Sequence, residues 1–257
     1  MVKHETTKKI ALSMVNFESM YLKSQIPNLL TLSNLLSGVL SLFFCSQNQP
    51  EIAAWLILAG AGFDFFDGLA ARSLGVSGEL GKQLDSLADM VSFGVAPVFL
   101  ALQFNGVFGS EFVLGWKALL LFVPLLMAAF SAYRLGKFNI DTRQSTGFIG
   151  LPTPANALFW VSIALASTGG LFELEPLNQG LNYFKESTGL VDFATILLGI
   201  LLVSEIPFLA LKFSSEAGGN KSKITLIVIG LGLFILFGFS SIPIVLLLYF
   251  IISLIRK

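Results

Sequence analysis

The sequence predicts an all-α polytopic integral membrane protein that crosses the bilayer about eight times. Three observations support this fold class. Of the 257 residues, 54% are hydrophobic and only 12% are charged, and the mean hydropathy is +0.80, a composition typical of membrane proteins. Apolar stretches close to the length of about 20 residues that a helix needs to span a bilayer recur along the whole chain. The basic residues, finally, concentrate in alternate connections between these stretches.

The apolar stretches define the expected spans. They lie at about 27–46, 52–73, 83–103, 113–133, 154–171, 190–211, 224–240 and 242–255. The last two are separated only by Ser240, Ser241 and Pro243. The sequence therefore leaves open whether these two form a tight hairpin or one irregular unit.

The distribution of lysine and arginine predicts the orientation. In the expected arrangement fourteen of the sixteen basic residues fall on one side of the membrane, and only Lys117 and Lys185 fall on the other. Cytoplasmic loops carry the excess of basic residues in membrane proteins. We therefore expect both termini in the cytoplasm, which agrees with an even number of spans.

Four aspartates interrupt the apolar pattern. Asp64 and Asp67 lie within the second expected span, and Asp85 and Asp89 lie at the start of the third. A carboxylate at membrane depth costs roughly 2.5 kcal/mol or more, so this cluster needs a compensating ligand. Spacings of three and four residues put each pair on one helix face. The sequence therefore predicts a helical hairpin that presents four carboxylates to one cavity.

Multivalent metal is the ligand that suits this cluster. Carboxylate oxygens favour Mg²⁺, Mn²⁺ or Ca²⁺ over zinc and copper, and Mg²⁺ is commonly shared between carboxylates and substrate phosphates. Four carboxylates indicate two ions, which together can clamp the attacking and leaving oxygens of a phosphoryl displacement. Arg72 lies five residues after Asp67, where its guanidinium would pair with phosphate oxygens.

The competing interpretations are a proton relay, neutralised buried pairs, or a cation transporter that uses the aspartates as an ion path. A transporter predicts a discontinuous helix near the midplane and internal repeat symmetry. The aspartates instead lie toward one face, in one hairpin, beside Arg72. Its positive charge would oppose a passing cation.

The acidic segment carries a long motif of fixed spacing, Asp64-x2-Asp67-Gly68-x2-Ala71-Arg72-x8-Gly81-x3-Asp85-x3-Asp89. It resembles the signature of the CDP-alcohol phosphatidyltransferases at every signature position. The resemblance covers about residues 24–215 and implies a six-helix catalytic core, usually in a homodimer, with an active site open to the cytoplasmic leaflet. It also implies the reaction: a small alcohol attacks the lipid-side phosphoryl group of a CDP-linked lipid, and CMP leaves.

The resemblance also assigns roles to residues. Asp64, Asp67 and Asp85 resemble metal ligands, and Asp89 resembles a residue that contacts a metal and acts as general base. The implied cofactors are two divalent ions, Mg²⁺ or Mn²⁺, with Ca²⁺ as a further option. The implied CDP-binding residues are Asp67, Gly68, Ala71, Arg72 and Gly81, together with Asn28 and Thr31 from a polar stripe on the first helix that continues to Asn34.

A second segment bears on the acceptor alcohol. Arg134-Leu-Gly-Lys137-Phe-Asn139 is followed by Gly147-Phe-Ile-Gly150-Leu-Pro152-Thr-Pro154-Ala155-Asn156. This pairing resembles the serine-accepting, phosphatidylserine synthase branch of the family found in bacteria and archaea. It implies CDP-diacylglycerol and L-serine as substrates and a prokaryotic inner or plasma membrane as the location, with no nucleic-acid partner. Glycerol phosphate or an inositol phosphate as acceptor, and an archaeal ether lipid as donor, remain open.

Three residues are candidates on the acceptor side. Arg134 and Lys137 would bind the lipid-side phosphate or the serine carboxylate, or would only anchor a helix end at the interface. Glu205, expected inside the sixth span, would orient either cation or recognise the serine amino group. We accordingly divide the chain into a cytoplasmic segment 1–23, a catalytic core 24–215 and two additional helices in 216–257.

Overall fold

The structure is a computed structural model that describes residues 2–76, 78–108, 119–141, 148–166, 170–172, 174–209 and 221–255. For Val2–Leu22 it describes the backbone alone. In chain order the described elements are α1 (Val2–Ser46), α2 (Pro50–Leu74), α3 (Glu79–Asp89), the π-helix η1 (Met90–Val95), α4 (Ala96–Phe104), α6 (Leu125–Ile140), β1 (Phe148–Ile149), α7 (Thr153–Ala164), α8 (Glu175–Glu186), α9 (Thr188–Val203), β2 (Pro207–Phe208), α10 (Lys221–Phe237), the 3-10 helix η3 (Gly238–Ser241) and α11 (Ile242–Ile255).

The described chain is helical apart from one short antiparallel strand pair, β1 with β2. By length and composition four segments of the described chain could cross a membrane, or five if α8 and α9, which meet at 91°, form one bent span. The outer surface carries exposed apolar side chains such as Leu36, Phe43 and Leu247, as a lipid-facing surface requires. These features confirm the predicted all-α membrane class, while the number of eight spans stays a prediction.

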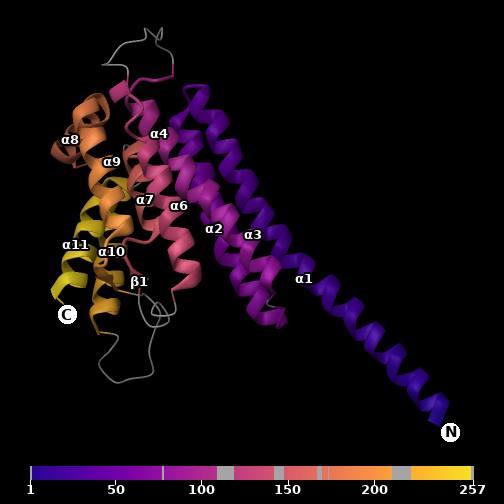
Figure 1. The fold of residues 1–257 in the computed structure, drawn as a ribbon. Helices are drawn as coiled ribbons and strands as arrows, with labels where there is room; N and C mark the ends of the chain where they lie inside the picture. The colour runs from indigo at the N-terminus through magenta and orange to yellow at the C-terminus, as the bar shows by residue number, and fades with distance from the viewer. Residues whose placement is uncertain are drawn as a thin grey trace.

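The first two helices form a long antiparallel pair, and the N-terminal part of α1 projects beyond the bundle (Figure 1). Small residues let these helices approach closely, as is usual between membrane helices. Ala53 and Ala54 of α2 are fully buried. A Cβ atom on Gly60 would lie 2.9 Å from Asn34 Oδ1 of α1, so a side chain there would separate the two helices.

The third span, Glu79–Phe104, contains a π-helix that the sequence did not predict. This π-helix begins at Met90, directly after Asp89. It packs on α1, where the Ser92 hydroxyl donates a hydrogen bond to the Asn34 carbonyl at 2.9 Å. π-Helical turns are rare and occur frequently at functional sites. This one joins the acidic end of the span to its apolar end.

Several predicted boundaries in the second half of the chain are wrong. Helix α6 ends at Ile140, so Arg134 and Lys137 lie in its last turns, as expected of a basic helix end, and the start of that predicted span, 113–118, lies outside the described residues. Helix α7 ends at Ala164. Helix α9 ends at Val203, because the chain then becomes extended and pairs as β2. The connection expected between the fifth and sixth spans contains helix α8.

The apolar segment Lys223–Ile255, of 33 residues, forms a helical hairpin. A Cβ atom on Gly230 of α10 would lie 3.3 Å from Val245 Cγ1 of α11, whereas 15 residues of straight helix would separate them by about 22 Å. The chain reverses at η3, where Gly238 has a φ of +59°, a conformation that favours glycine. Figure 1 shows α11 ending at the end of the bundle where α10 begins. The hairpin alternative is thus the one observed.

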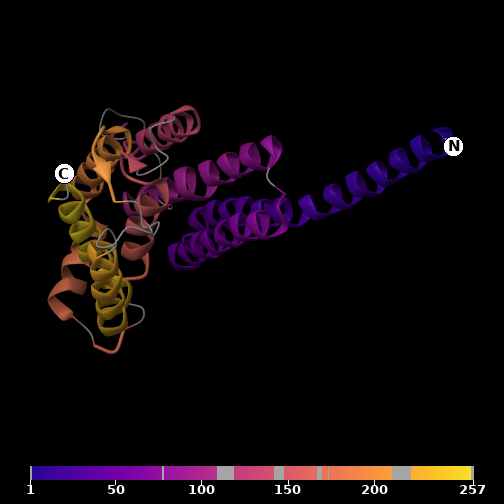
Figure 2. The same ribbon diagram turned by 90° about the horizontal axis from the view of Figure 1, so that it is seen from below.

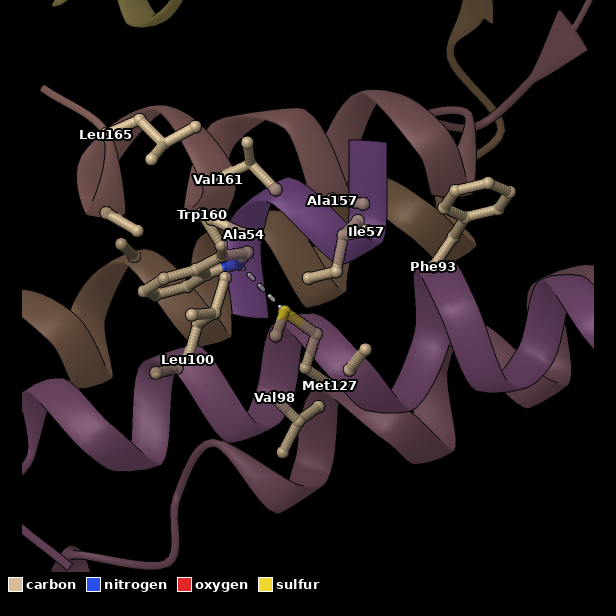
Figure 3. Close-up of a cluster of buried hydrophobic side chains, with 14 of the residues drawn as sticks. Ala54, Ile57, Phe93, Val98, Leu100, Met127, Ala157, Trp160, Val161 and Leu165 are labelled. Carbon is tan, nitrogen blue, oxygen red and sulfur yellow. Dashed lines mark hydrogen bonds between the residues drawn. The ribbon is translucent and has the colours of Figure 1, made fainter. Parts of the chain in front are cut away.

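A buried apolar cluster joins α7 to α2, α4 and α6 (Figure 3). Its largest side chain, Trp160, is fully buried and donates a hydrogen bond to Met127 Sδ at 3.1 Å. At the other end of the same helix pair, Arg134 of α6 contacts Thr153 of α7. These two contacts fix α6 and α7 in one antiparallel register. That register sets the position of the basic end of α6.

Candidate active site

Three of the four aspartates meet where α2 and α3 lie against α1. One carboxylate oxygen from each of Asp64, Asp67 and Asp85 lies within 4.8 Å of the other two. Asp67 is buried and the other two are half-buried. An acidic group of this kind, made only of hard oxygen ligands, suits Mg²⁺, Mn²⁺ or Ca²⁺. We call these three residues the acidic triad, and its donor set fits a divalent ion.

The fourth carboxylate lies beside the triad and deeper in the bundle. Asp89 adjoins the triad through Asp64, whose side chain interacts with both Asp85 and Asp89. Asn34 of α1 donates a hydrogen bond from Nδ2 to Asp89 Oδ1 at 3.4 Å. The structure therefore divides the four predicted ligands into a group of three and one neighbour.

The polar stripe of α1 faces this site. The Thr31 hydroxyl lies 2.6 Å from Asp67 Oδ2 and 3.0 Å from the Pro27 carbonyl, and its one proton favours the charged acceptor. Asn34 reaches Asp89 as described above. Asn28 lies one turn nearer the end of the bundle, with Oδ1 3.5 Å from the position of a Cβ atom on Gly81. A single helix face thus contacts both acidic helices.

A cavity of about 690 Å³ opens beside the acidic triad, a volume typical of small-molecule sites. Its lining residues are Pro27, Asn28, Thr31, Asp64, Asp67, Gly68, Ala71, Val76, Gly78, Glu79, Gly81, Lys82 and Asp85. They include every predicted CDP-binding residue except Arg72. The Arg72 side chain is exposed, and its Nη2 lies 3.9 Å from the position of a Cβ atom on Gly68. It therefore stands at the edge of the cavity.

The basic end of α6 lies near the acidic end of α3. Arg134 is buried, donates from Nη1 to Thr153 Oγ1 at 3.0 Å and lies over the Phe138 ring at 5.1 Å. Its charge also interacts with Asp89. Arg134 therefore lies within electrostatic range of the acidic site.

Lys137 and Glu205 form an ion pair. Glu205 lies after the end of α9 and not inside that helix, so its predicted location was wrong. Its exposed side chain reaches Lys137 from the extended segment that leads to β2. Of the two cations proposed as its partner, the structure pairs it with Lys137.

Sequence reasoning missed several residues around the site. Glu79 and Lys82 line the cavity. Asn139 Nδ2 donates to Ser86 Oγ at 2.9 Å and so ties α3, next to Asp85, to the end of α6. Asn139 stood within the basic motif, but nothing in the sequence indicated Ser86 as its partner.

The comparisons with known proteins agree with this geometry. The family model described as CDP-alcohol phosphatidyltransferase matches residues 24–185, and the chain belongs to this family of phosphotransferase enzymes. A Helicobacter pylori protein named CDP-diacylglycerol–serine O-phosphatidyltransferase is 33% identical over 234 residues, which is 90% of each chain. Proteins of the same name from Bacillus subtilis and Methanocaldococcus jannaschii are 36% identical over 129 residues and 32% identical over 183 residues. The match to the Bacillus subtilis protein covers 50% of this chain and 69% of that protein, and the match to the Methanocaldococcus jannaschii protein covers 71% and 73%.

The family expected from the acidic motif is thereby confirmed, as is the expectation of a membrane-bound transferase. The roles of individual residues remain predictions.

Proposed function

We propose that this protein transfers the phosphatidyl group from CDP-diacylglycerol to the hydroxyl of L-serine, giving phosphatidylserine and CMP. One observation carries the proposal: the acidic triad adjoins a cavity large enough for a nucleotide, in a chain whose relatives from bacteria and an archaeon are named for this activity. The motifs at 134–139 and 147–156, which resemble the serine-accepting branch, support serine over other alcohols, and the charge of Arg134 interacts with Asp89.

We assign the acidic triad and Asp89 to two divalent ions, Mg²⁺ or Mn²⁺. When bound, such ions neutralise the diphosphate and stabilise the charge that develops on the transferred phosphoryl group. The CDP moiety occupies the cavity lined by Asn28, Thr31, Gly68, Ala71 and Gly81. Arg72 at its edge pairs with phosphate oxygens. Chelation of divalent ions should therefore stop turnover.

Asp89 is the proposed general base. The serine hydroxyl oxygen forms a bond to the lipid-side phosphorus, the bond between this phosphorus and the CMP oxygen breaks, and the hydroxyl proton passes to Asp89. Asn34 holds Asp89 through its hydrogen bond, so the carboxylate can orient the hydroxyl for in-line attack. Arg134 supplies positive charge on the acceptor side, for the lipid phosphate or the serine carboxylate.

The setting is also part of the proposal. The enzyme lies in the inner or plasma membrane of a prokaryote as a homodimer, with its active site and both termini in the cytoplasm. Residues 24–215 form the catalytic core, preceded by the segment 1–23 and followed by the two helices in 216–257. The distribution of basic residues supports this orientation.

Acceptor competition tests the proposal. Purified protein in detergent is incubated with CDP-diacylglycerol, Mg²⁺ or Mn²⁺, and radiolabelled serine, glycerol 3-phosphate or inositol phosphate in separate reactions. Label should enter lipid only from serine, with CMP released in step. Incorporation from another alcohol would reject the serine assignment and keep the chemistry, and no incorporation from any would favour the transporter interpretation.

A further inference from the structure

The C-terminal hairpin α10–α11 lies outside the residues matched by the family model, yet it packs against elements that bear on the acceptor side. Helix α11 contacts α7 and β2, and Figures 1 and 2 show the hairpin beside α7. Its charge-free helix α11 carries two buried hydroxyl residues, Tyr249 and Ser253. Both face the same short stretch of chain.

These two hydroxyls bind both backbone groups of Leu209, the residue after β2. The Leu209 amide donates to Ser253 Oγ at 3.1 Å, and the Tyr249 hydroxyl donates to the Leu209 carbonyl at 3.1 Å. The Tyr249 ring also packs on Phe208 at a centroid distance of 5.6 Å. An unpaired backbone group in an apolar interior is costly. The two side chains therefore hold the chain after β2 in one position.

The position of Leu209 also determines that of β1, because β1 pairs with β2. The strands pair with Phe148 opposite Phe208 and Ile149 opposite Pro207, and the Gly150 amide donates to the Ile206 carbonyl at 2.9 Å. Gly150 has a φ of +80°, and the backbone of Leu202 occupies the space that a side chain would need. The two segments consequently move as one unit.

Both segments lead directly to acceptor-side residues. Thr153, three residues after Gly150, accepts the hydrogen bond of Arg134. Glu205, on the segment before β2, pairs with Lys137. The charge of Arg134 also interacts with Asp89. The contacts at Leu209 therefore support both Thr153, the partner of Arg134, and Glu205, the partner of Lys137.

We propose that Tyr249 and Ser253 are positioning residues for acceptor binding: by holding Leu209 they fix the β1–β2 pair, and through Thr153 and Glu205 they position Arg134 and Lys137. The proposal rests on the proposed function and assigns the two additional helices to the catalytic unit. The donor cavity, formed by α1, α2, α3 and the link after α2, contains no residue of this chain of contacts.

Kinetics with both substrates test this inference. Tyr249→Phe combined with Ser253→Ala removes both hydrogen bonds and keeps the ring. Loss of both bonds should raise the KM for serine about tenfold, which corresponds to about 1.4 kcal/mol, with the KM for CDP-diacylglycerol unchanged. Replacing the alanine of the double variant by threonine (Tyr249→Phe with Ser253→Thr) restores a hydroxyl at position 253 and should reverse part of the rise in the KM for serine. Ser241→Ala is the matched control, because it removes a buried hydroxyl from the same hairpin.

Equal changes in both KM values, or values matching those of wild type or Ser241→Ala, would overturn the inference. If the double variant does not yield folded protein, Tyr249→Phe alone provides the same comparison with a smaller change. Failure of the proposed function is seen separately, because it appears in the wild-type enzyme as failure to use serine. The KM values of the variants are then measured with whichever alcohol the wild-type enzyme accepts.

Discussion

Asp89 differs from the other aspartates in its surroundings. The acidic triad lies at the cavity, whereas Asp89 lies deeper, where it accepts a hydrogen bond from Asn34 and interacts with the charge of Arg134. A carboxylate held by an amide on one side and close to a cation on the other is oriented for one task. The geometry supports a division in which the triad serves as metal ligands alone, whereas Asp89 contacts a metal and also accepts the proton.

Asp89→Asn tests this division. The amide keeps the size of the side chain but cannot accept the hydroxyl proton, so CMP release should fall by roughly 10²–10⁴-fold, the usual contribution of a general base. The rate of CMP release and the thermal unfolding temperature are measured together. An unchanged unfolding temperature shows that the site is still folded, and turnover near the wild-type rate contradicts the role as base.

Thr31 is expected to act through Asp67. Its hydroxyl lies 2.6 Å from Asp67 Oδ2, and loss of a hydrogen bond to a metal-binding carboxylate typically weakens metal affinity about 10–100-fold. Thr31→Val should therefore shift the Mg²⁺ concentration for half-maximal activity upward by that factor. Thr31→Ser keeps the hydroxyl and is the control. Identical metal dependence in Thr31→Val and wild type would show that Asp67 needs no such support.

At the scale of elements, the contact between α1 and the π-helix η1 sets the position of Asp89. Gly38 of α1 faces Ser92, and a Cβ atom there would lie 2.9 Å from Ser92 Cα. This neighbour is backbone and cannot rotate away. Overpacking of this kind costs about 1–3 kcal/mol and would also move Asn34 relative to Asp89.

Gly38→Ala should accordingly lower the thermal unfolding temperature in detergent and reduce turnover. Gly62→Ala on α2 is the matched control, because nothing lies within 4 Å of the position of its Cβ atom. Alanine is the better helix former by about 1 kcal/mol, so this control should be neutral or stabilising. Equal unfolding temperatures and turnover rates for Gly38→Ala and Gly62→Ala would mean that α1 and η1 can move apart without loss of stability or activity.

The presence of the helices and of the acidic site could be predicted from the sequence, whereas the residues at which helices such as α7 and α9 end could not. The apolar stretch after α9 continues through Ile206 and Phe208, and hydropathy does not distinguish an apolar strand from the end of a helix. The π-helix after Asp89 has no composition signal, because its sequence Met90–Val95 is as apolar as the helix that follows. The pairing of Glu205 with Lys137 depends on the β1–β2 contact, which links residues distant in sequence.

The motif spacing was more informative than hydropathy because it concerns side chains on fixed helix faces. Asp64 and Asp67 lie three residues apart on α2, and the first turns of α3 bring Asp85 against them. What spacing could not show was the separation of Asp89 from this group. That separation depends on how deeply α3 enters the bundle and on the packing of Asn34.

At the scale of the whole molecule, the cavity and the charged residues around it lie at one end of the bundle. Arg72, Lys82 and Lys137 belong to that end, where α2 stops and α3 begins. Helix α8, which carries Lys185, lies at the opposite end (Figure 1). Between the two ends the surface is largely apolar. A bilayer covering this surface leaves the cavity open to one aqueous side.

The positive-inside rule predicts that this side is the cytoplasm, and cysteine labelling can test it. The chain has one cysteine, the buried Cys45, so Cys45→Ala provides a cysteine-free parent. Ser73→Cys places an exposed thiol near the end of α2 beside the cavity, and Asn182→Cys places one on α8 at the opposite end. Neither residue lines the cavity.

In intact bacterial cells a membrane-impermeant maleimide should label Asn182→Cys at once and Ser73→Cys only after permeabilisation. A charged reagent cannot cross the hydrocarbon layer, so the order of labelling reports the side of each thiol. The cysteine-free parent sets the background. The reverse order would place the cavity outside, away from the cytoplasmic pools of nucleotide and amino acid, and would contradict both the orientation and the proposed supply of serine. Labelling of both variants before permeabilisation would contradict a single fixed orientation.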